Sequence, residues 1–317
     1  MPHFGRIVTS TEEKITKEGA KKSRQVNKGD LILSNSMSYG LPYIMGIDGY
    51  IHDGWFVLKN FENTFDKDYL CNLLISSAIQ NQYKRLAAGG VVQNISSDLV
   101  NSVSVSIPTM MEQKKISSLL NLIDERIATQ NKIIDKLQSL IKGIAQKIVR
   151  SNKPNVRLYE CVECSFSTQQ ESEVCEQGAY PVYGANGIVG YLDDYNTEGE
   201  AVYIIKDGSG VGTVSYVTGK CSATGTLNTL QAKDGYSLQY LYYLLKVFNF
   251  EPYKTGMAIP HIYFKDYGKA KVFCPSYTEQ LQYARLLSAI DSKLSVEKNT
   301  LRNLSLQKQY LLRQMFI

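Results

Sequence analysis

The sequence predicts an α+β protein in which two mixed, β-rich domains are separated by two long antiparallel coiled-coil helices. Three observations carry this prediction: an internal repeat, a heptad pattern of apolar residues at the end of each copy, and Gly-rich, strand-like segments before it. Residues 89–149 and 256–316 align without a gap at an offset of 167. Self-similarity at a fixed offset indicates one module that is used twice.

The helix at the end of each copy is predicted from apolar residues at alternating spacings of four and three, the pattern of a coiled coil. The first series runs from Ile116 and the second from Tyr283, and Pro108 and Pro275 precede them. A helix of about 36 residues spans roughly 54 Å, which suits a spacer. A helix buried in a globular core would give a similar series, although it usually buries a wider face.

One polar residue interrupts the apolar seam of each helix at the same position, Gln130 in the first copy and Glu297 in the second. If the helices pair antiparallel about a pseudo-two-fold axis, these two residues meet near its centre. A lone polar residue in such a seam commonly fixes the register at some cost in stability.

The segments before the helices are β-rich. Residues 178–230 alternate β-branched and aromatic runs with Gly, Asn and Asp turns, and residues 29–60 do the same. Short helices are expected at 66–84 and 237–249. The predicted parts are a first domain at 1–108, a spacer helix at 109–150, a second domain at 155–275 and a second spacer helix at 276–317.

Composition limits the class of protein without naming a function. The N-terminus lacks a signal-peptide core, and no apolar run approaches the roughly 18–20 residues that a membrane span needs. The 6 cysteines show no regular disulfide framework, so we expect a cytoplasmic protein with no membrane partner. A net charge of +5 permits nucleic-acid binding but does not require it.

Sequence motifs for catalysis or metal binding are weak in this chain. The glycine-rich run at 208–212 is followed by a strand-like segment and not by a helix, which favours a hairpin or a close approach to DNA over a nucleotide loop. Cys161 and Cys164 have the spacing of half a zinc site, but no second pair follows. We therefore expect no catalytic residue, metal or cofactor in this chain.

Several of these segments resemble the specificity subunits of type I restriction–modification systems. They are Tyr180–Ile188 with Gly190, the strand after Gly199-Glu200, and the helix starts at Pro108 with Glu112-Gln113 and Pro275 with Glu279-Gln280. The resemblance covers nearly the whole chain. It implies a non-catalytic DNA-recognition subunit in which each target-recognition domain reads one half of a split target, and the helices set the gap.

The resemblance also implies partners. Modification subunits would carry S-adenosylmethionine and methylate adenine, and restriction subunits would use ATP and Mg to translocate and cleave double-stranded DNA. Two other functions remain open: a self-contained DNA-modifying enzyme fragment, which the missing catalytic motifs disfavour, and a coiled-coil assembly protein without a DNA role. The first module has only 28 residues before Gly29, against 43 from Arg157 to Gly199, so we expect an N-terminally shortened first domain.

Candidate DNA-binding residues are cations near the β-rich segments and polar residues in their loops. Each has an ordinary alternative, since a charged run is usually a solvated face and a polar loop residue usually serves a turn. Exposed positions near the Glu-Gln pairs are candidates for contacts with partner subunits. The DNA-binding candidates are Lys21, Lys22, Arg24, Ser34, Asn35, Ser36, Lys84, Arg85 and Asn94 in the first half, and Tyr183, Asn186, Lys206, Ser209, Lys254 and His261 in the second.

Overall fold

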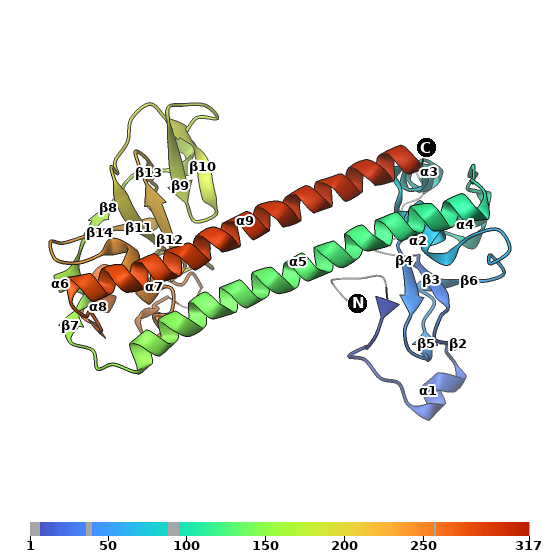
Figure 1. Ribbon diagram of the computed structural model, residues 1–317, viewed down its shortest axis with the longest axis horizontal. Coiled ribbons are helices and arrows are strands. Elements are labelled where there is room, and N and C mark those ends of the chain that lie inside the picture. Colours follow the sequence, from blue (N-terminus) through green and yellow to red (C-terminus); the bar gives the residue numbers. More distant parts are fainter. Residues whose placement is uncertain (1–6, 36–39, 88–94, 257, 317) are drawn as a thin grey trace. The chain divides into compact units, whose positions relative to one another are not determined.

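The computed structural model describes residues 7–35, 40–87, 95–256 and 258–316. The chain forms two compact units, the first made of residues 1–133 with 297–317 and the second of residues 134–296. Each unit contains one β-rich part and a segment of each of the two long helices, α5 (Met110–Arg150) and α9 (Tyr277–Met315), which are green and red in Figure 1. The mixed helix and sheet content agrees with the predicted α+β class.

The β-rich part of the first unit is built on the strand β3. Its sheet has the order β1-β4-β3-β6, in which β3 runs antiparallel to both neighbours and β1 runs parallel to β4. A second pair joins β2 and β5. The elements in chain order are β1 (Ile7–Val8), α1 (Lys17–Lys21), β2 (Arg24–Val26), β3 (Leu31–Ser34), β4 (Pro42–Met45), β5 (Gly49–Ile51), β6 (Trp55–Leu58), α2 (Lys67–Ile75), α3 (Ser77–Ala87) and α4 (Ser97–Ser102).

Strand β3 is buried on both faces, which explains its continuous apolar sequence. Successive side chains of a strand point to opposite faces. Leu31 and Leu33 lie in the cluster that includes Tyr69 of α2, whereas Ile32 lies in a second cluster with Val26 of β2. The strand therefore forms the centre of this unit.

The helix expected at 66–84 is divided into α2 and α3. Ser76 lies between them in an extended conformation with φ −63° and ψ 152°, which ends α2. Its hydroxyl oxygen then accepts a hydrogen bond from the backbone N–H of Ile79 at 3.4 Å, inside α3. The expected helical segment therefore consists of two short helices, because Ser76 caps the second helix instead of continuing the first.

The second unit has a four-stranded antiparallel sheet in the order β12-β11-β14-β8, with a three-stranded sheet β10-β9-β13 and the pair β15-β7. The expected helix at 237–249 is the shorter α7. The elements are β7 (Val156–Arg157), α6 (Leu158–Cys161), β8 (Val162–Phe166), η1 (Glu171–Glu173), β9 (Tyr180–Gly184), β10 (Gly187–Leu192), β11 (Glu200–Ile205), β12 (Val214–Thr218), β13 (Ser222–Ala223), β14 (Leu227–Ala232), α7 (Leu238–Leu245), η2 (Glu251–Tyr253), α8 (Phe264–Tyr267) and β15 (Lys271–Val272).

The two units share a central three-stranded arrangement. The order β4-β3-β6 in the first corresponds to β12-β11-β14 in the second, and the central strand is antiparallel to both neighbours in each case. The fourth strand differs: β8 pairs with β14 in the second unit, whereas β1 pairs with β4 at the opposite edge in the first. The sequence repeat is therefore also a repeat of strand order.

The segments of the two long helices in the first unit pack antiparallel. Near one end, Ile116 of α5 lies in a hydrophobic cluster with Met315 of α9. Further along, Gln130 of α5 contacts Glu297 of α9. The contact positions rise along one helix as they fall along the other, so the antiparallel coiled-coil pairing is confirmed here. Among the described helices, none is long and apolar enough to cross a membrane.

Each long helix begins with the same pair of side chains. The Glu112 carboxylate accepts hydrogen bonds from the backbone N–H and hydroxyl of Thr109, at 3.0 and 2.8 Å. The Glu279 carboxylate accepts the equivalent bonds from Ser276, at 3.2 and 2.6 Å. These hydrogen bonds lower the pKa of Glu112, because they favour its charged form. The glutamate of the repeated Glu-Gln pair is thus part of a helix cap.

The glutamine of each pair attaches the long helix to the β-rich part of its unit. Gln113 Oε1 accepts a hydrogen bond from the Asp66 N–H at 2.9 Å, and Gln280 Oε1 accepts one from the Ser237 N–H at 2.9 Å. Asp66 and Ser237 are the N-caps of α2 and α7. Both glutamines are buried, so their side chains are closed to partner subunits.

Candidate nucleic-acid interface

The same backbone joint follows the central strand in both units. In the second unit the Ile262 N–H donates to the carbonyl of Lys206 at 2.9 Å, and in the first the Ile95 N–H donates to the carbonyl of Asn35 at 3.0 Å. The offset of 167 places Ile95 on Ile262. The joint therefore brings the residue after the central strand, Asn35 or Lys206, against Ile95 or Ile262, and in the second unit it places several sequence candidates together.

In the second unit this joint organises a group of residues that we call the second loop cluster, residues 206–213, 254–256 and 258–263. Thr255 and His261 exchange two backbone hydrogen bonds, at 2.9 and 2.8 Å, and Gly208 N–H donates to the carbonyl of Pro260 at 2.9 Å. The cluster contains the candidates Lys206, Ser209, Lys254 and His261. The sequence candidates of this half are thus mostly neighbours in space.

The turn of the second loop cluster depends on Gly256. Its φ is +87°, in the left-handed region that favours glycine, and an added Cβ would lie 2.3 Å from the carbonyl oxygen of Ile259. The His261 Nδ1 lies 3.2 Å from the same oxygen. This geometry closes the turn tightly and holds the imidazole ring at its edge.

The lysines of this cluster have local acidic partners. Lys206 Nζ lies 3.9 Å from an Asp207 carboxylate oxygen, and Lys254 Nζ lies 2.6 Å from a Glu251 carboxylate oxygen. Ion pairs at a protein surface contribute about 0–1 kcal/mol, so a DNA phosphate can compete with them. Ser209 is exposed beside them.

Tyr183 and Asn186 lie in a different place, on the hairpin of β9 and β10. The Tyr183 ring packs against the ring of Tyr203 with centroids 5.7 Å apart, in a buried cluster with Ala201. Burial raises the pKa of Tyr183. Tyr183 therefore belongs to the packing of this unit, whereas Asn186 is exposed at the turn.

The cationic candidates of the first unit occupy two places. Lys21 and Lys22 are exposed at the end of α1, Arg24 is exposed on β2, and the Lys21 Nζ lies 3.1 Å from a Glu18 oxygen. Lys84 and Arg85 are exposed in the last turn of α3, where two cations also stabilise the negative end of the helix dipole. All five side chains are thus exposed to solvent.

The polar candidates after β3 serve the loop. Ser34 is buried and its hydroxyl oxygen accepts a hydrogen bond from the Leu41 N–H at 3.1 Å, so its side chain is closed to a base edge. The Ser34 side chain therefore stabilises the loop and does not face a DNA base. Asn35 Nδ2 donates to the carbonyl of Asp53 at 2.7 Å. Ser36 and Asn94 lie outside the described residues.

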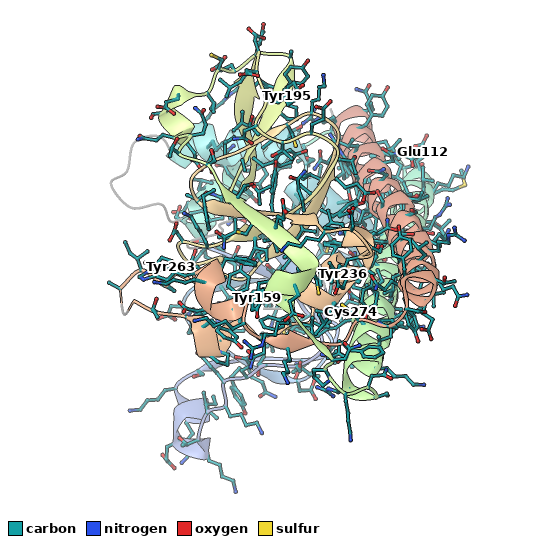
Figure 2. The ribbon with its side chains drawn as sticks, turned by 90° about the vertical axis from the view of Figure 1, so that its left-hand side faces the viewer. Glu112, Tyr159, Tyr195, Tyr236, Tyr263 and Cys274 are labelled. Atoms are coloured by element: carbon teal, nitrogen blue, oxygen red, sulfur yellow. The ribbon has the colours of Figure 1, made fainter. Side chains whose placement is uncertain are left out.

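Three exposed apolar side chains near the second loop cluster were not among the sequence candidates. Phe166 at the end of β8 is 62% exposed, Ile259 is 67% exposed and Tyr263 is 46% exposed. Figure 2 shows Tyr263 at the surface of the second unit. In the sequence, the short run of apolar and aromatic residues around His261 is the one pattern that could have indicated Tyr263 as a candidate. No sequence pattern indicates Phe166.

Cysteine geometry agrees with a structural role for the Cys161–Cys164 spacing. Cys161 Sγ lies 3.8 Å from Cys274 Sγ, in a buried contact. Burial raises the pKa of Cys164 to about 12, which keeps this thiol protonated. Within the described part of the chain, no group of three or more His, Cys, Asp or Glu residues could hold a metal ion.

The family model for the type I restriction modification DNA specificity domain matches residues 4–139 and 157–305. A putative type I specificity subunit of Mycoplasma genitalium, S.MgeORF438P, is 25% identical over 261 residues, which cover 75% of this chain and 68% of that protein. The EcoprrI specificity subunit of Escherichia coli is 27% identical over 117 residues, 37% of this chain and only 29% of that subunit.

Solved structures show the same fold. The S subunit of the type I restriction–modification system from M. genitalium has a TM-score of 0.66 at 20% identity, covering 94% of this chain and 85% of that one. A chain from a structure of type I system assembly and conformational transition has a TM-score of 0.59 at 16% identity, covering 91% and 82%. With the family model matching both repeats, the chain belongs to the type I restriction–modification DNA specificity domain family.

Proposed function

We propose that each β-rich part reads one half of a split duplex-DNA target, and that the long helices fix the gap between the halves. Family membership makes DNA sequence recognition the class of function and the role non-catalytic. The observation that supports one half-site per unit is the repeated joint, Ile95 with Asn35 and Ile262 with Lys206, behind an equivalent central strand. Each unit thus has the same central strand arrangement and the same joint, but different residues next to the joint.

The loops differ in residues that can contact bases or phosphates. Position 35 is asparagine where position 206 is lysine, and Ser96 stands where Tyr263 stands in the second copy. Base edges in the major groove are distinguished by their donors, acceptors and methyl groups. Loops with different side chains should therefore select different half-sites.

A spacer needs a fixed helix register, and Gln130 supports one. Its Nε2 donates to the Glu297 carbonyl at 3.1 Å and also to the Glu297 carboxylate, and both residues are buried. A shift of register would leave these groups without those bonds, at a cost of about 1–3 kcal/mol for each unsatisfied group. One register is thereby favoured, as a fixed gap requires.

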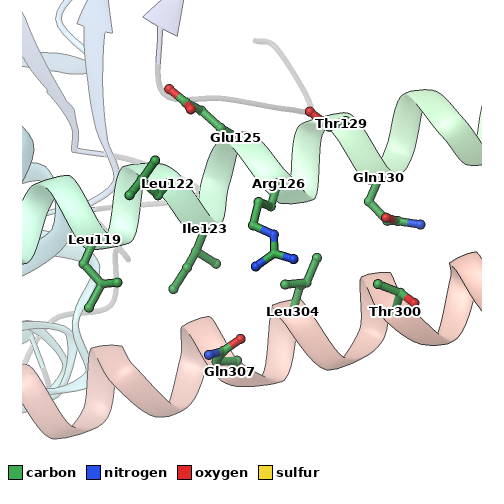
Figure 3. Close-up of a pocket in the computed structure, with 10 residues that line it drawn as sticks. All are labelled: Leu119, Leu122, Ile123, Glu125, Arg126, Thr129, Gln130, Thr300, Leu304 and Gln307. Atoms are coloured by element: carbon green, nitrogen blue, oxygen red, sulfur yellow. The ribbon is translucent and has the colours of Figure 1, made fainter.

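We propose the helix pair as the docking surface for modification subunits that carry S-adenosylmethionine, with ATP and Mg on restriction subunits. Leu119, Leu122 and Leu304 contribute to a groove of about 570 Å³ in the first unit. Figure 3 shows Leu119 and Arg126 extending from α5 toward α9. Leu119 and Leu122 are both exposed on this helix, and neighbouring exposed apolar side chains can mark an interaction site. The complex would work in the cytoplasm.

The decisive experiment exchanges one domain. Residues 157–274 are replaced by the same domain of a relative, and the methylated motif is determined by methylome sequencing in cells that also contain the modification subunit. The expected result is a motif with one half changed and with the other half and the gap retained. A second variant, shortened within residues 130–140, should change the gap alone. A domain exchange that rewrites both halves would refute the proposal.

The two rival functions have their own readouts. Methyl transfer to DNA by the purified chain with S-adenosylmethionine alone would identify a self-contained enzyme. Failure of the chain to retard duplex DNA, both alone and with the modification subunit, would favour an assembly protein without a DNA role.

A further inference from the structure

The second loop cluster carries an apolar surface that the proposed function has not yet used. Phe166, Ile259 and Tyr263 are 62%, 67% and 46% exposed, and we call these three residues the apolar triplet. Phe166 lies beside Lys206, and Ile259 and Tyr263 lie beside His261, so all three border the second loop cluster. Exposed apolar groups around one loop can mark an interaction site. Their position beside Lys206 and His261 makes this the surface from which a target would be read.

Contacts connect the members of the triplet through the loop cluster. Lys206 Nζ lies over the Phe166 ring, 5.8 Å from its centroid, and the Lys206 carbonyl accepts the Ile262 N–H. The His261 ring meets the Tyr263 ring edge-on, with centroids 5.1 Å apart. Lys265 Nζ lies over the same Tyr263 ring at 5.1 Å. A lysine thus accompanies each of the two aromatic rings.

The chemistry of a base edge determines what such a surface can read. In the major groove, the C5-methyl group of thymine is the apolar feature, and phenylalanine or other apolar contacts recognise it. The lysines above the rings fit the phosphates that border a groove. A partner protein could also cover an apolar surface, but cations placed over both aromatic rings favour duplex DNA.

We propose that the apolar triplet recognises thymine C5-methyl groups in the half-site read by the second unit, while Lys206 and Lys265 contact the flanking phosphates. This inference rests on the proposed function and specifies the base that this unit prefers. The first unit has a different arrangement, because Ser96 occupies the position of Tyr263 and caps α4 by accepting the Leu99 N–H at 3.2 Å. Thymine recognition of this kind is therefore a property of the second unit.

The test has two stages and uses the full chain. A pool of random duplexes is first selected with the wild-type chain to obtain its preferred sequence. Each thymine of that sequence is then replaced by uracil, which differs only by lacking the methyl group. We expect the affinity to fall about fourfold at each thymine that the triplet reads, the effect of removing one buried methyl group. At thymines of the other half-site, the loss of affinity caused by uracil should be the same in the wild type and in variants of Phe166 or Tyr263.

The variants are Phe166→Ser and Tyr263→Ser, of which the second reproduces the residue of the first unit. Each should bind the thymine duplex more weakly than the wild type and should lose the difference between thymine and uracil. The matched control is Tyr50→Ser in the first unit, where Tyr50 is also 46% exposed. This control should retain the full uracil effect in the half-site of the second unit.

The outcomes separate this inference from the proposed function. If the wild type enriches no sequence, either alone or together with the modification subunit, the proposed function itself fails. If a sequence is enriched, but replacing thymine by uracil lowers the affinity of Phe166→Ser and Tyr263→Ser as much as that of the wild type, the thymine assignment is wrong. Normal DNA binding by both variants, with loss of co-purification of the modification subunit, would overturn it in favour of a protein-docking surface.

Discussion

Replacing Gln113 by alanine should detach the start of α5 from the β-rich part of the first unit. The side chain is buried and makes three hydrogen bonds: Oε1 accepts from the Asp66 N–H at 2.9 Å, and Nε2 donates to the carbonyls of Thr64 and Pro108 at 3.0 and 3.1 Å. Alanine leaves all three backbone groups without this partner. The perturbation thus removes a connection between elements and leaves the helix pattern intact.

The expected magnitude follows from the number of bonds lost. A hydrogen bond contributes about 1 kcal/mol net, so Gln113→Ala should lower the free energy of unfolding by about 3 kcal/mol. Gln280 makes two such bonds, to Ser237 and Pro275, so Gln280→Ala should cost about 2 kcal/mol. For units of this size these values correspond to losses of about 6–12 °C and 4–8 °C in Tm.

Thermal and urea unfolding measure the global effect, and hydrogen exchange measures the local one. In Gln113→Ala the Asp66 amide should lose protection, because its acceptor is gone. Gln113→Glu should keep that acceptor but lose both donor bonds, so it should destabilise the protein while protecting the Asp66 amide. The exposed Gln138 on the same helix provides the control, and Gln138→Ala should change the free energy of unfolding by less than about 0.5 kcal/mol.

The reasoning is refuted if Gln113→Ala costs no more than Gln138→Ala, or if the Asp66 amide is equally protected in both variants. In either case the repeated Gln would not be what joins each spacer helix to its unit.

Two further variants test other features of the first unit. Burial raises the pKa of Tyr83 to about 12, against about 10 in an unfolded chain. The stabilisation from the neutral Tyr83 side chain is therefore complete below pH 10. As the pH rises from 10 to 12, the free energy of unfolding should fall by about 2–3 kcal/mol. The Tyr83 hydroxyl has no hydrogen-bond partner among the described residues, so Tyr83→Phe should not lower the free energy of unfolding at pH 7. Urea titrations should show that this free energy declines less steeply above pH 10 in Tyr83→Phe than in the wild type, whereas the exposed control Tyr310→Phe should keep the wild-type decline. A decline in Tyr83→Phe as steep as that of the wild type contradicts this. Replacing Gln130 and Glu297 together by leucine should raise the Tm, because a buried polar contact becomes an apolar one, while loosening the register; a lower Tm would show that the contact is a net stabiliser.

Features that repeat along the chain could be predicted from the sequence. The offset of 167 placed Gln130 and Glu297 at one seam position, and the structure has them in contact. The repeated Glu-Gln pairs could also be identified in the sequence, but the capping role of Glu112 and the connecting role of Gln113 could not. A capping glutamate needs only a neighbour three residues away, whereas the bond from Gln113 to Asp66 joins residues far apart in the sequence.

The site itself was predictable only in part, because burial depends on the pairing of distant strands. Ser34 and Asn35 are adjacent in the sequence, yet Ser34 is buried and Asn35 is half-buried. Tyr183 is a residue suited to reading DNA but packs on Tyr203 of another sheet. Phe166 at a strand end has the sequence context of a core residue, and only the structure shows that it is exposed.

The order in which the two units occur along the chain has a consequence for synthesis and for genetic exchange. The second unit is one continuous segment, residues 134–296, whereas the first is interrupted by it and includes residues 297–317. Tyr69, for example, packs against Phe316, with ring centroids 5.1 Å apart. A ribosome must therefore synthesise residues 297–317 before the first unit can complete its core, while the second can fold earlier. Two crossovers, near codons 133 and 297, would replace the whole second unit and leave every contact within the first unit intact.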